Sequence, residues 1–143
     1  MEANIEKIDK LFIESSDVIL KSKILSQKIN DTIKLIILSL EQKKKILIFG
    51  NGGSASDAQH MAAEFVSRYL IERLSLPAIA LTTDTSILTS IGNDYDFDKI
   101  FSRQCESLVN EGDIIIAIST SGKSQNVILG IEEAKQKGAK IIS

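Results

Sequence analysis

The chain has 143 residues, of which 43% are hydrophobic and 25% charged, and its formal net charge is -2. This is enough apolar material for one domain with a substantial core, and no basic stripe interleaved with aromatic residues suggests nucleic-acid binding. No apolar run approaches the roughly 20 residues that span a bilayer, and the lone Cys105 can form no internal disulfide. We therefore expect a cytoplasmic protein that binds neither nucleic acid nor membrane.

Two long helices are expected first, from Ile5 to about Lys44. Apolar residues recur there at helical spacing, and neither proline nor glycine interrupts them. Their apolar residues occupy more than one face, so we expect these helices to mediate assembly of the chain with copies of itself. The basic run at residues 43–45 is interpreted as a solvated helix end.

Strands then alternate with helices. The expected strands are residues 46–50, 78–81 and 114–118, and the expected helices are residues 54–70, 85–91, 98–110 and 124–137. This alternation predicts an α/β fold with a parallel sheet covered by helices on both faces. Residues 138–143 resemble a helix stop and a strand that is cut short. We expect one domain over residues 1–143, with helices to about 44, an α/β core from about 45, and a missing C-terminal strand and helix.

A glycine-rich turn follows the first expected strand. Residues 50–57 read Gly-Asn-Gly-Gly-Ser-Ala-Ser-Asp, and Ser54 with Asp57 forms a Ser-x-x-Asp capping pattern for the next helix. Glycines let a ligand approach the backbone closely, and the N–H groups of a helix N-terminus bind anions. The turn is either a capped strand-to-helix connection or a ligand site, and its place at the carboxyl end of a strand favours the ligand site.

A serine-rich turn follows the third expected strand. Residues 119–124 read Ser-Thr-Ser-Gly-Lys-Ser and open a helix, so hydroxyls and free N–H groups suit a phosphate group. A nucleotide-binding P-loop would need glycine where the chain has Ala117. We expect this turn to bind a small phosphorylated metabolite, with helix capping by one serine as the structural alternative.

His60 and Glu64 are four residues apart and share one face of the expected helix. They are interpreted as a metal-ligand pair, an acid/base pair or an ordinary surface pair. Apolar neighbours suggest that this helix is largely covered, and polar side chains on a covered helix favour a functional role. Asn93 and Asp94 form a further polar cluster, in which Asp94 accepts hydrogen bonds either from sugar hydroxyls or within an Asx turn.

Five segments in this order resemble the sugar isomerase (SIS) domain, and specifically the phosphoheptose isomerase family. They are residues 50–54, 57–64, 91–94, 101–104 and 118–124. The resemblance extends from the N-terminal helices to the last residue. It implies an SIS-type, flavodoxin-like three-layer fold and a homotetramer that interconverts sedoheptulose 7-phosphate and D-glycero-D-manno-heptose 7-phosphate for heptose and lipopolysaccharide precursor synthesis.

The resemblance also implies roles for particular residues. The substrate would lie between subunits, its phosphate held by Ser119, Thr120, Ser121 and Ser124, and its sugar lined by Asn51, Gly52, Gly53, Ser54, Asn93 and Asp94. His60 and Glu64 would be two of four ligands of a zinc ion, and Glu64 would also be one of two acid/base groups in an enediol mechanism. The partner histidine and a glutamine ligand belong to a C-terminal helix for which this chain has no residues.

Two other functions are compatible with the same domain. One is a non-catalytic protein resembling the tetrameric factor that associates with the bacterial replication initiator. That group lacks the carboxylate at the position of Glu64, so Glu64 favours the enzyme. The other is a regulator that senses sugar phosphates, which would keep residues 119–124 and need no acid/base pair.

Overall fold

The computed structural model describes residues 4–143 and divides into two units, with the boundary between Leu35 and Ile36. The first unit contains α1 (Ile5–Lys21), the 3-10 helix η1 (Ser22–Leu25) and the first part of α2 (Ser26–Glu41). The last turns of α2 belong to the second unit. The expectation of two long N-terminal helices is confirmed.

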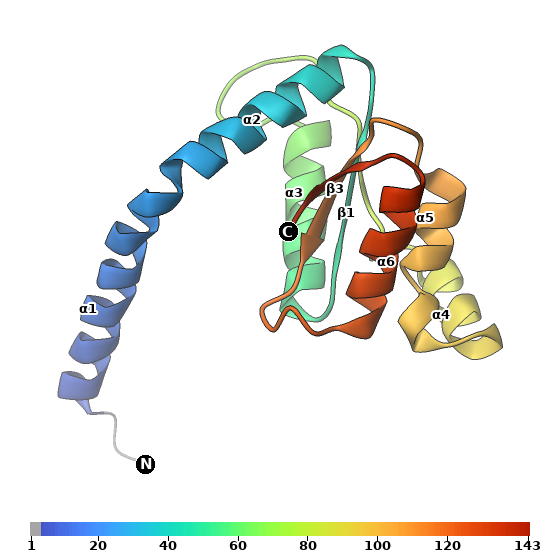
Figure 1. Cartoon of the computed structure of the whole chain (residues 1–143). Coiled ribbons are helices and arrows are strands. Elements are labelled where there is room, and N and C mark those ends of the chain that lie inside the picture. Colours follow the sequence, from blue (N-terminus) through green and yellow to red (C-terminus); the bar gives the residue numbers. More distant parts are fainter. Residues whose placement is uncertain (1–3) are drawn as a thin grey trace. The chain divides into compact units, whose positions relative to one another are not determined.

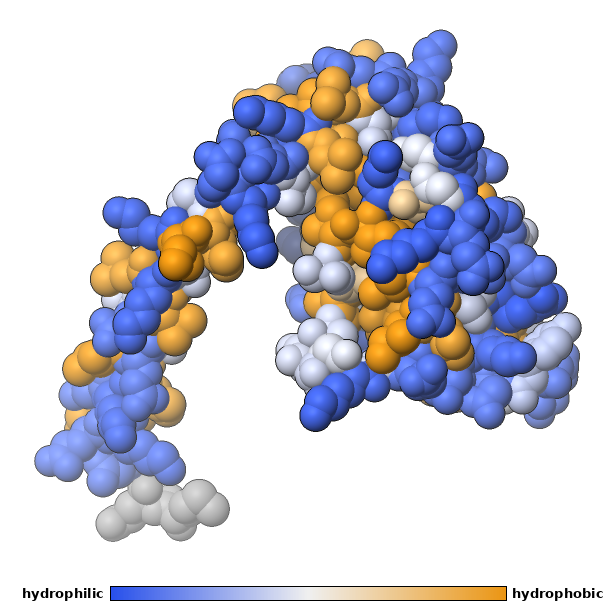
Figure 2. Space-filling model, viewed as in Figure 1, coloured by the Kyte–Doolittle hydropathy of each residue, from blue (hydrophilic) through white to orange (hydrophobic). Residues whose placement is uncertain are grey.

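The helices of the first unit carry an apolar stripe. Ile5, Phe12 and Ile19 are spaced by seven residues, two helical turns, and each is more than 70% exposed. Figure 2 shows hydrophobic patches along this unit. All residues from Asn4 to Asp31 are exposed, so this unit buries none of the stripe by itself.

The second unit is built on a parallel sheet of four strands in the order β2-β1-β3-β4. The strands are β1 (Ile46–Gly50), β2 (Ala78–Ala80), β3 (Ile114–Ile118) and β4 (Lys140–Ile142). Helix α3 (Gly53–Val66) joins β1 to β2, and α6 (Gln125–Gln136) joins β3 to β4. Between β2 and β3 lie α4 (Thr85–Asp94), η2 (Phe97–Lys99) and α5 (Ser102–Leu108). The predicted α/β class and parallel sheet are confirmed.

The strand order creates a switch point between β1 and β3. From β1 the chain crosses outward to β2, and from β3 it crosses in the opposite direction to β4. Because such crossovers are right-handed, the two connecting helices lie on opposite faces of the sheet. Figure 1 shows α3 on one side of β1 and β3, with α5 and α6 on the other. In such sheets ligands bind beyond the carboxyl ends of the two diverging strands.

The main core lies between the sheet and the layer of α5 and α6. Phe49 and Phe101 stack there with ring centroids 4.9 Å apart. Gly130 of α6 lies directly against them, since a Cβ at that position would be 3.0 Å from Phe101 Cβ and from Phe49 Cζ. Cys105 is fully buried in this cluster.

The structure corrects several helix limits. The helix expected over residues 54–70 is α3, which ends at Val66, and the helix expected over 85–91 continues to Asp94. The helix expected over 98–110 is divided into η2 and α5, because the Asp96 carboxylate accepts a hydrogen bond from Asp98 N–H and forms a separate 3-10 turn. The segment at 138–143 forms the expected strand, β4.

The basic run at residues 43–45 is only partly solvated. Lys45 Nζ lies 2.5 Å from Asp113 Oδ2, and Asp113 is 1% exposed. The same carboxylate accepts hydrogen bonds from Lys45 N–H and Asn110 N–H. The interpretation of Lys45 as part of a solvated helix end is therefore wrong: Lys45 ties the amino ends of β1 and β3 together. Across the described residues, no helix is long and apolar enough to cross a membrane.

Candidate functional site

The glycine-rich turn lies at the switch point, directly beyond β1. A Cβ on Gly50 would lie 2.6 Å from the Ile118 carbonyl oxygen and 2.7 Å from Ser54 Cβ, so only glycine lets β1, β3 and α3 converge here. Gly52 has a φ of +56°, a conformation that favours glycine. Gly52 and Gly53 are both exposed, and a Cβ on either would meet nothing within 4 Å. The turn therefore presents bare backbone at the start of α3.

Ser54 does not cap α3, contrary to the capping pattern suggested by the sequence. The N-cap position is Gly52 and the helix begins at Gly53. Ser54 is therefore inside the first turn, where it is 9% exposed and packs against Gly50. Gly52 provides no side-chain cap, and the N–H groups of Ser54 and Ala55 bond to the carbonyl oxygens of Asn51 and Gly52, so the exposed N–H groups of Gly52 and Gly53 are the ones that face a ligand.

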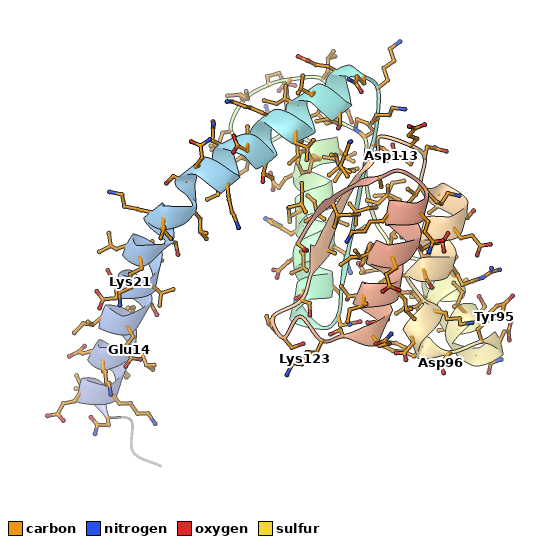
Figure 3. All side chains as sticks on the ribbon, in the orientation of Figure 1. Glu14, Lys21, Tyr95, Asp96, Asp113 and Lys123 are labelled. Carbon is orange, nitrogen blue, oxygen red and sulfur yellow. The ribbon has the colours of Figure 1, made fainter. Side chains whose placement is uncertain are left out.

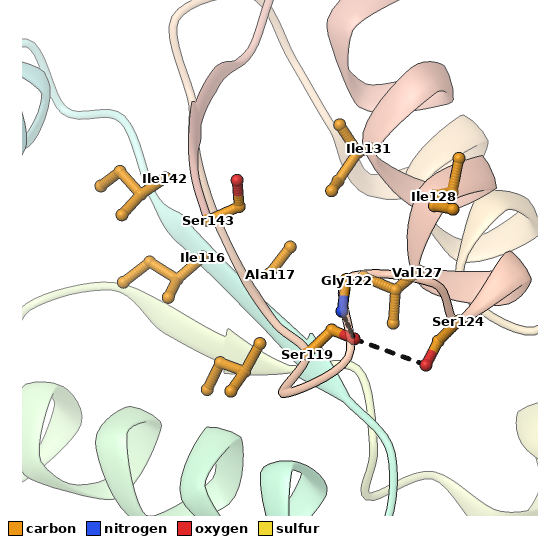
Figure 4. Close-up of a pocket in the computed structure, with 11 residues that line it drawn as sticks. Ile116, Ala117, Ser119, Gly122, Ser124, Val127, Ile128, Ile131, Ile142 and Ser143 are labelled. Carbon is orange, nitrogen blue, oxygen red and sulfur yellow. Dashed lines mark hydrogen bonds between the residues drawn. The ribbon is translucent and has the colours of Figure 1, made fainter.

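The serine-rich turn lies beside it, beyond β3. Ser119 Oγ accepts a hydrogen bond from Gly122 N–H at 3.1 Å and lies 3.5 Å from Ser124 Oγ, as Figure 4 shows. Ser121 Oγ accepts from Lys123 N–H at 3.2 Å. Ser124 occupies the N-cap position of α6 but makes no side-chain capping bond. The Ser124 hydroxyl therefore does not cap α6, and the structural alternative of helix capping by this serine is wrong.

The hydroxyls of this turn differ in exposure. Ser119 and Ser124 are half-buried, whereas Thr120 and Ser121 are exposed. Ser119 and Ser124 also line a mostly apolar cavity of about 440 Å³ that extends to Ile142 and Ser143. Figure 3 shows Lys123 at the tip of the turn, pointing away from the sheet. The structure therefore brings two hydroxyls and a helix N-terminus together around one concave surface.

A pair of amides joins the two turns. Asn51 Nδ2 donates to Asn126 Oδ1 at 2.8 Å, and Asn126 Nδ2 donates to Asn51 Oδ1 at 2.9 Å. Asn126 is 2% exposed and lies in the first turn of α6. Nothing in the sequence alone marks Asn126, because a single asparagine in a helix carries no motif.

His60 and Glu64 face a different cavity, of about 380 Å³, together with Tyr69 and Arg73. His60 Nε2 lies 3.8 Å from Glu64 Oε1, and the two side chains are 79% and 36% exposed. The expectation that α3 is largely covered is wrong for this face, because its buried residues are Ser54, Ala58 and Ala62. His60 and Glu64 are accordingly open to solvent within one chain.

Arg73 holds the helix end that carries Glu64. Its guanidinium donates to the Glu64 carbonyl oxygen at 2.6 Å and to the Phe65 carbonyl oxygen at 2.9 Å. The final carbonyls of a helix have no partner within it, so Arg73 satisfies two of them and places a cation where the helix dipole favours one. No sequence signal marked Arg73, which follows α3 by several loop residues.

One chain does not bring all the candidate residues together. A rise of 1.5 Å per residue places Glu64 about 16 Å along α3 from Gly53, away from both turns. Asn93 and Asp94 form the exposed end of α4, where Asn93 Nδ2 donates a hydrogen bond to Asp94 Oδ1. Because Asp94 is part of the helix, the Asx-turn alternative is wrong. Neither lines the cavity of about 180 Å³ beside Asn51 and Gly52. Within residues 4–143, no three histidine, cysteine or acidic side chains gather as a metal site.

Known proteins that are similar to this chain identify its family. The SIS domain model matches residues 12–143. A phosphoheptose isomerase of Aquifex aeolicus (strain VF5) is 53% identical over 140 residues, which are 97% of this chain and 73% of that protein. The chain belongs to the phosphoheptose isomerase family.

Further similarity supports this membership. A phosphoheptose isomerase of Burkholderia pseudomallei (strain K96243) is 62% identical over 102 residues, which are 71% of this chain and 52% of that protein. The solved structure of a phosphoheptose isomerase from Francisella tularensis matches with a TM-score of 0.93 at 36% identity, covering 98% of this chain and 74% of that one. The chain thus spans about half to three quarters of the length of these family members.

Proposed function

We propose that the protein is an aldose-ketose isomerase that interconverts sedoheptulose 7-phosphate and D-glycero-D-manno-heptose 7-phosphate for heptose and lipopolysaccharide precursor synthesis. The observation that carries this proposal is the convergence of two ligand-type turns beyond β1 and β3, in a chain of the phosphoheptose isomerase family. A phosphorylated seven-carbon sugar has one anionic end and a chain of hydroxyls, and the two turns offer complementary surfaces to these parts.

The serine-rich turn would bind the phosphate. Ser119, Thr120, Ser121 and Ser124 supply hydroxyl donors, and the first N–H groups of α6 add partial positive charge. The uncapped Ser124 supports this assignment, because its hydroxyl is not used by the helix. Backbone N–H groups of Gly52 and Gly53, together with Ser54, would bind the sugar, and Asn93 and Asp94 would add contacts to its hydroxyls.

Glu64 would move the proton. In an enediol mechanism a base removes the proton on the carbon beside the carbonyl, while the carbonyl oxygen gains a proton. A proton is then returned to the neighbouring carbon, the former carbonyl carbon, and a hydroxyl proton is lost, so no net oxidation occurs. Glu64 is a carboxylate at a solvent-accessible cavity, held by a helix end that Arg73 fastens.

His60 and Glu64 also fit two positions of a zinc site. Imidazole nitrogen and carboxylate oxygen bind zinc at about 2.0–2.2 Å, so two ligands of one ion lie within about 4 Å of each other. His60 Nε2 and Glu64 Oε1 are 3.8 Å apart and meet this requirement. Zinc held there would supply Lewis-acid polarisation of the sugar carbonyl. Zinc needs further ligands, which would be the histidine and glutamine of the C-terminal helix that the family resemblance implies.

The active form would be a homotetramer in the cytoplasm, with the substrate between subunits. Glu64 and the two turns are separated within one chain, and assembly of copies could bring Glu64 of one to the turns of another. The exposed stripe of Ile5, Phe12 and Ile19 supports assembly, because water-exposed apolar area of this kind favours burial against a partner.

The test is turnover of sedoheptulose 7-phosphate by the protein carrying Glu64→Gln. Glutamine keeps the shape and hydrogen bonding of the side chain but cannot titrate, so we expect turnover to fall about 10²–10⁴-fold while the sugar phosphate still binds. The matched control is Glu132→Gln, which removes an exposed carboxylate from α6. Turnover of Glu64→Gln within a few-fold of the parent would exclude Glu64 as the acid/base.

A further inference from the structure

The two turns at the switch point are fastened to each other by the Asn51–Asn126 amide pair. We propose that Asn126 is a positioning residue, which holds the serine-rich turn and the glycine-rich turn at one fixed separation so that phosphate and sugar bind together. This inference rests on the proposed function, since it concerns how that ligand is held.

The geometry of the pair makes it a stiff connection. Each amide donates one hydrogen bond and accepts one, at 2.8 Å and 2.9 Å, so neither side chain can rotate without breaking both bonds. Asn126 is 2% exposed, and an amide buried to that extent costs free energy if it is left without a partner. The two residues are 75 positions apart, and α3, β2, α4, η2, α5 and β3 lie between them in the chain, so the bonds join segments distant in sequence.

The position of the pair links it to ligand binding. Asn51 directly precedes Gly52, the N-cap of α3, and Asn126 is two residues after Ser124, the N-cap of α6. The N–H groups of Gly52 and Gly53 and the first N–H groups of α6 are the donors that the proposal assigns to the ligand. A movement at either asparagine therefore displaces the N–H groups of the helix beside it.

The same bonds change the role expected for Asn51. Resemblance to the family assigned Asn51 to the sugar, but one edge of its amide is already occupied by Asn126. The exposed backbone of Gly52 and Gly53 remains open to the sugar. Asn51 thus contributes chiefly by placing that backbone, and Asn126 contributes by placing Asn51.

The experiment is a double-mutant cycle with Asn51→Ala, Asn126→Ala and the double variant, in the complete chain. Binding of sedoheptulose 7-phosphate and of inorganic phosphate is measured by titration calorimetry, with thermal unfolding measured in parallel. We expect Asn126→Ala to weaken sugar-phosphate binding roughly 10-fold, and to have little further effect when Asn51 is already alanine. Inorganic phosphate, which needs only one turn, should lose much less affinity.

Two comparisons separate positioning from general stability. Asp113→Asn breaks the polar cluster at the amino ends of the same strands, far from Lys123 in Figure 3, so it should lower the melting temperature without changing sugar-phosphate affinity. Asn126→Asp keeps the acceptor for Asn51 and provides a second variant if alanine prevents folding.

The outcomes distinguish this inference from the proposed function. Unchanged sugar-phosphate affinity in folded Asn126→Ala or Asn126→Asp, or additive losses in the cycle, would overturn the inference alone. Equal losses for sugar phosphate and inorganic phosphate would also overturn it. A parent protein that binds no sugar phosphate at all would instead overturn the proposed function.

Discussion

Lys45 and Asp113 form a half-buried ion pair that closes the amino ends of the two central strands. The Asp113 carboxylate accepts three hydrogen bonds, two from Lys45 and one from the Asn110 backbone. The side chain of Asp113 is 2% exposed and that of Lys45 is 22% exposed, so solvent screens the pair only partly.

Replacing Asp113 by asparagine should therefore be costly. The substitution leaves the Lys45 ammonium without its counter-charge and turns one acceptor into a donor facing other donors. We expect a loss of about 3 kcal/mol in the free energy of unfolding, measured by urea titration. Lys10→Gln breaks the exposed pair with Glu14 and serves as control, since exposed pairs contribute at most about 1 kcal/mol. Equal effects of both variants would contradict this account of Asp113.

The hydroxyls of the serine-rich turn should contribute unequally. Ser121 Oγ is partly used by Lys123 N–H and is exposed, whereas Ser124 Oγ is half-buried and makes no capping bond. Ser124→Ala should weaken binding of inorganic phosphate in calorimetry by roughly 10-fold with little loss of stability. Ser121→Ala should have a smaller effect, and the double variant should bind phosphate most weakly. A double variant with the affinity of the parent would remove the phosphate assignment.

Because of Cys105, the free energy of unfolding should fall as the pH rises into the alkaline range. Burial, helped by the nearby Glu133 carboxylate and opposed by Lys137, raises the pKa of its thiol from 9.0 to about 12. The unfolded chain therefore loses this proton first. The stabilisation is complete below pH 9 and is lost as the pH rises toward 12, at about 1.4 kcal/mol per pH unit.

Cys105→Ala isolates this contribution. Urea unfolding between pH 8 and pH 10.5 should show a steeper fall in stability for the parent than for Cys105→Ala. The variant also loses packing in the core, but that loss is the same at every pH and does not alter the slope. Parallel pH profiles would mean that the thiol ionises as readily in the folded protein as in the unfolded chain.

The apolar stripe of α1 should determine assembly. Replacing Phe12 and Ile19 by glutamate places charge on a face that an oligomer would bury, so sedimentation velocity should show dissociation toward monomers. Lys10→Gln changes an exposed polar position of the same helix and should leave the assembly intact. An oligomer that survives both glutamates would place the interface elsewhere.

Local patterns in the sequence were sufficient for the fold. The three short apolar runs form β1, β2 and β3, since continuous apolar residues between turn signals specify buried parallel strands. The limits of α3 and α5 were less accurate. Arg73, which lies beyond α3, donates to a carbonyl at the end of that helix, and Asp96 accepts a hydrogen bond that starts a 3-10 turn before α5. The spacing of apolar residues does not reveal either contact.

The site was predictable only in part. Glycine and serine turns carry recognisable chemistry, so both were identified, and strand order then placed them side by side. Asn126 and Arg73 were missed because their roles depend on partners that only the folded chain brings near. The solvent exposure of His60 was also unforeseen, because Ala58 and Ala62 are buried whereas His60 and Ala63, on the same helix, are exposed.

Gly130 shows how a core contact can govern a distant loop. Helix α6 packs closely against the stacked pair of Phe49 and Phe101 at this residue, where a Cβ would lie 3.0 Å from Phe101 Cβ and Phe49 Cζ, so these side chains would have to shift to admit it. Gly130 lies about one and a half turns from the N-terminus of α6, so this contact sets how the first turn of the helix is placed. A larger side chain at residue 130 would tilt α6 and displace Ser124 and Asn126 relative to the glycine-rich turn. The size of the side chain at residue 130 in the core therefore sets the distance between the glycine-rich turn and the serine-rich turn.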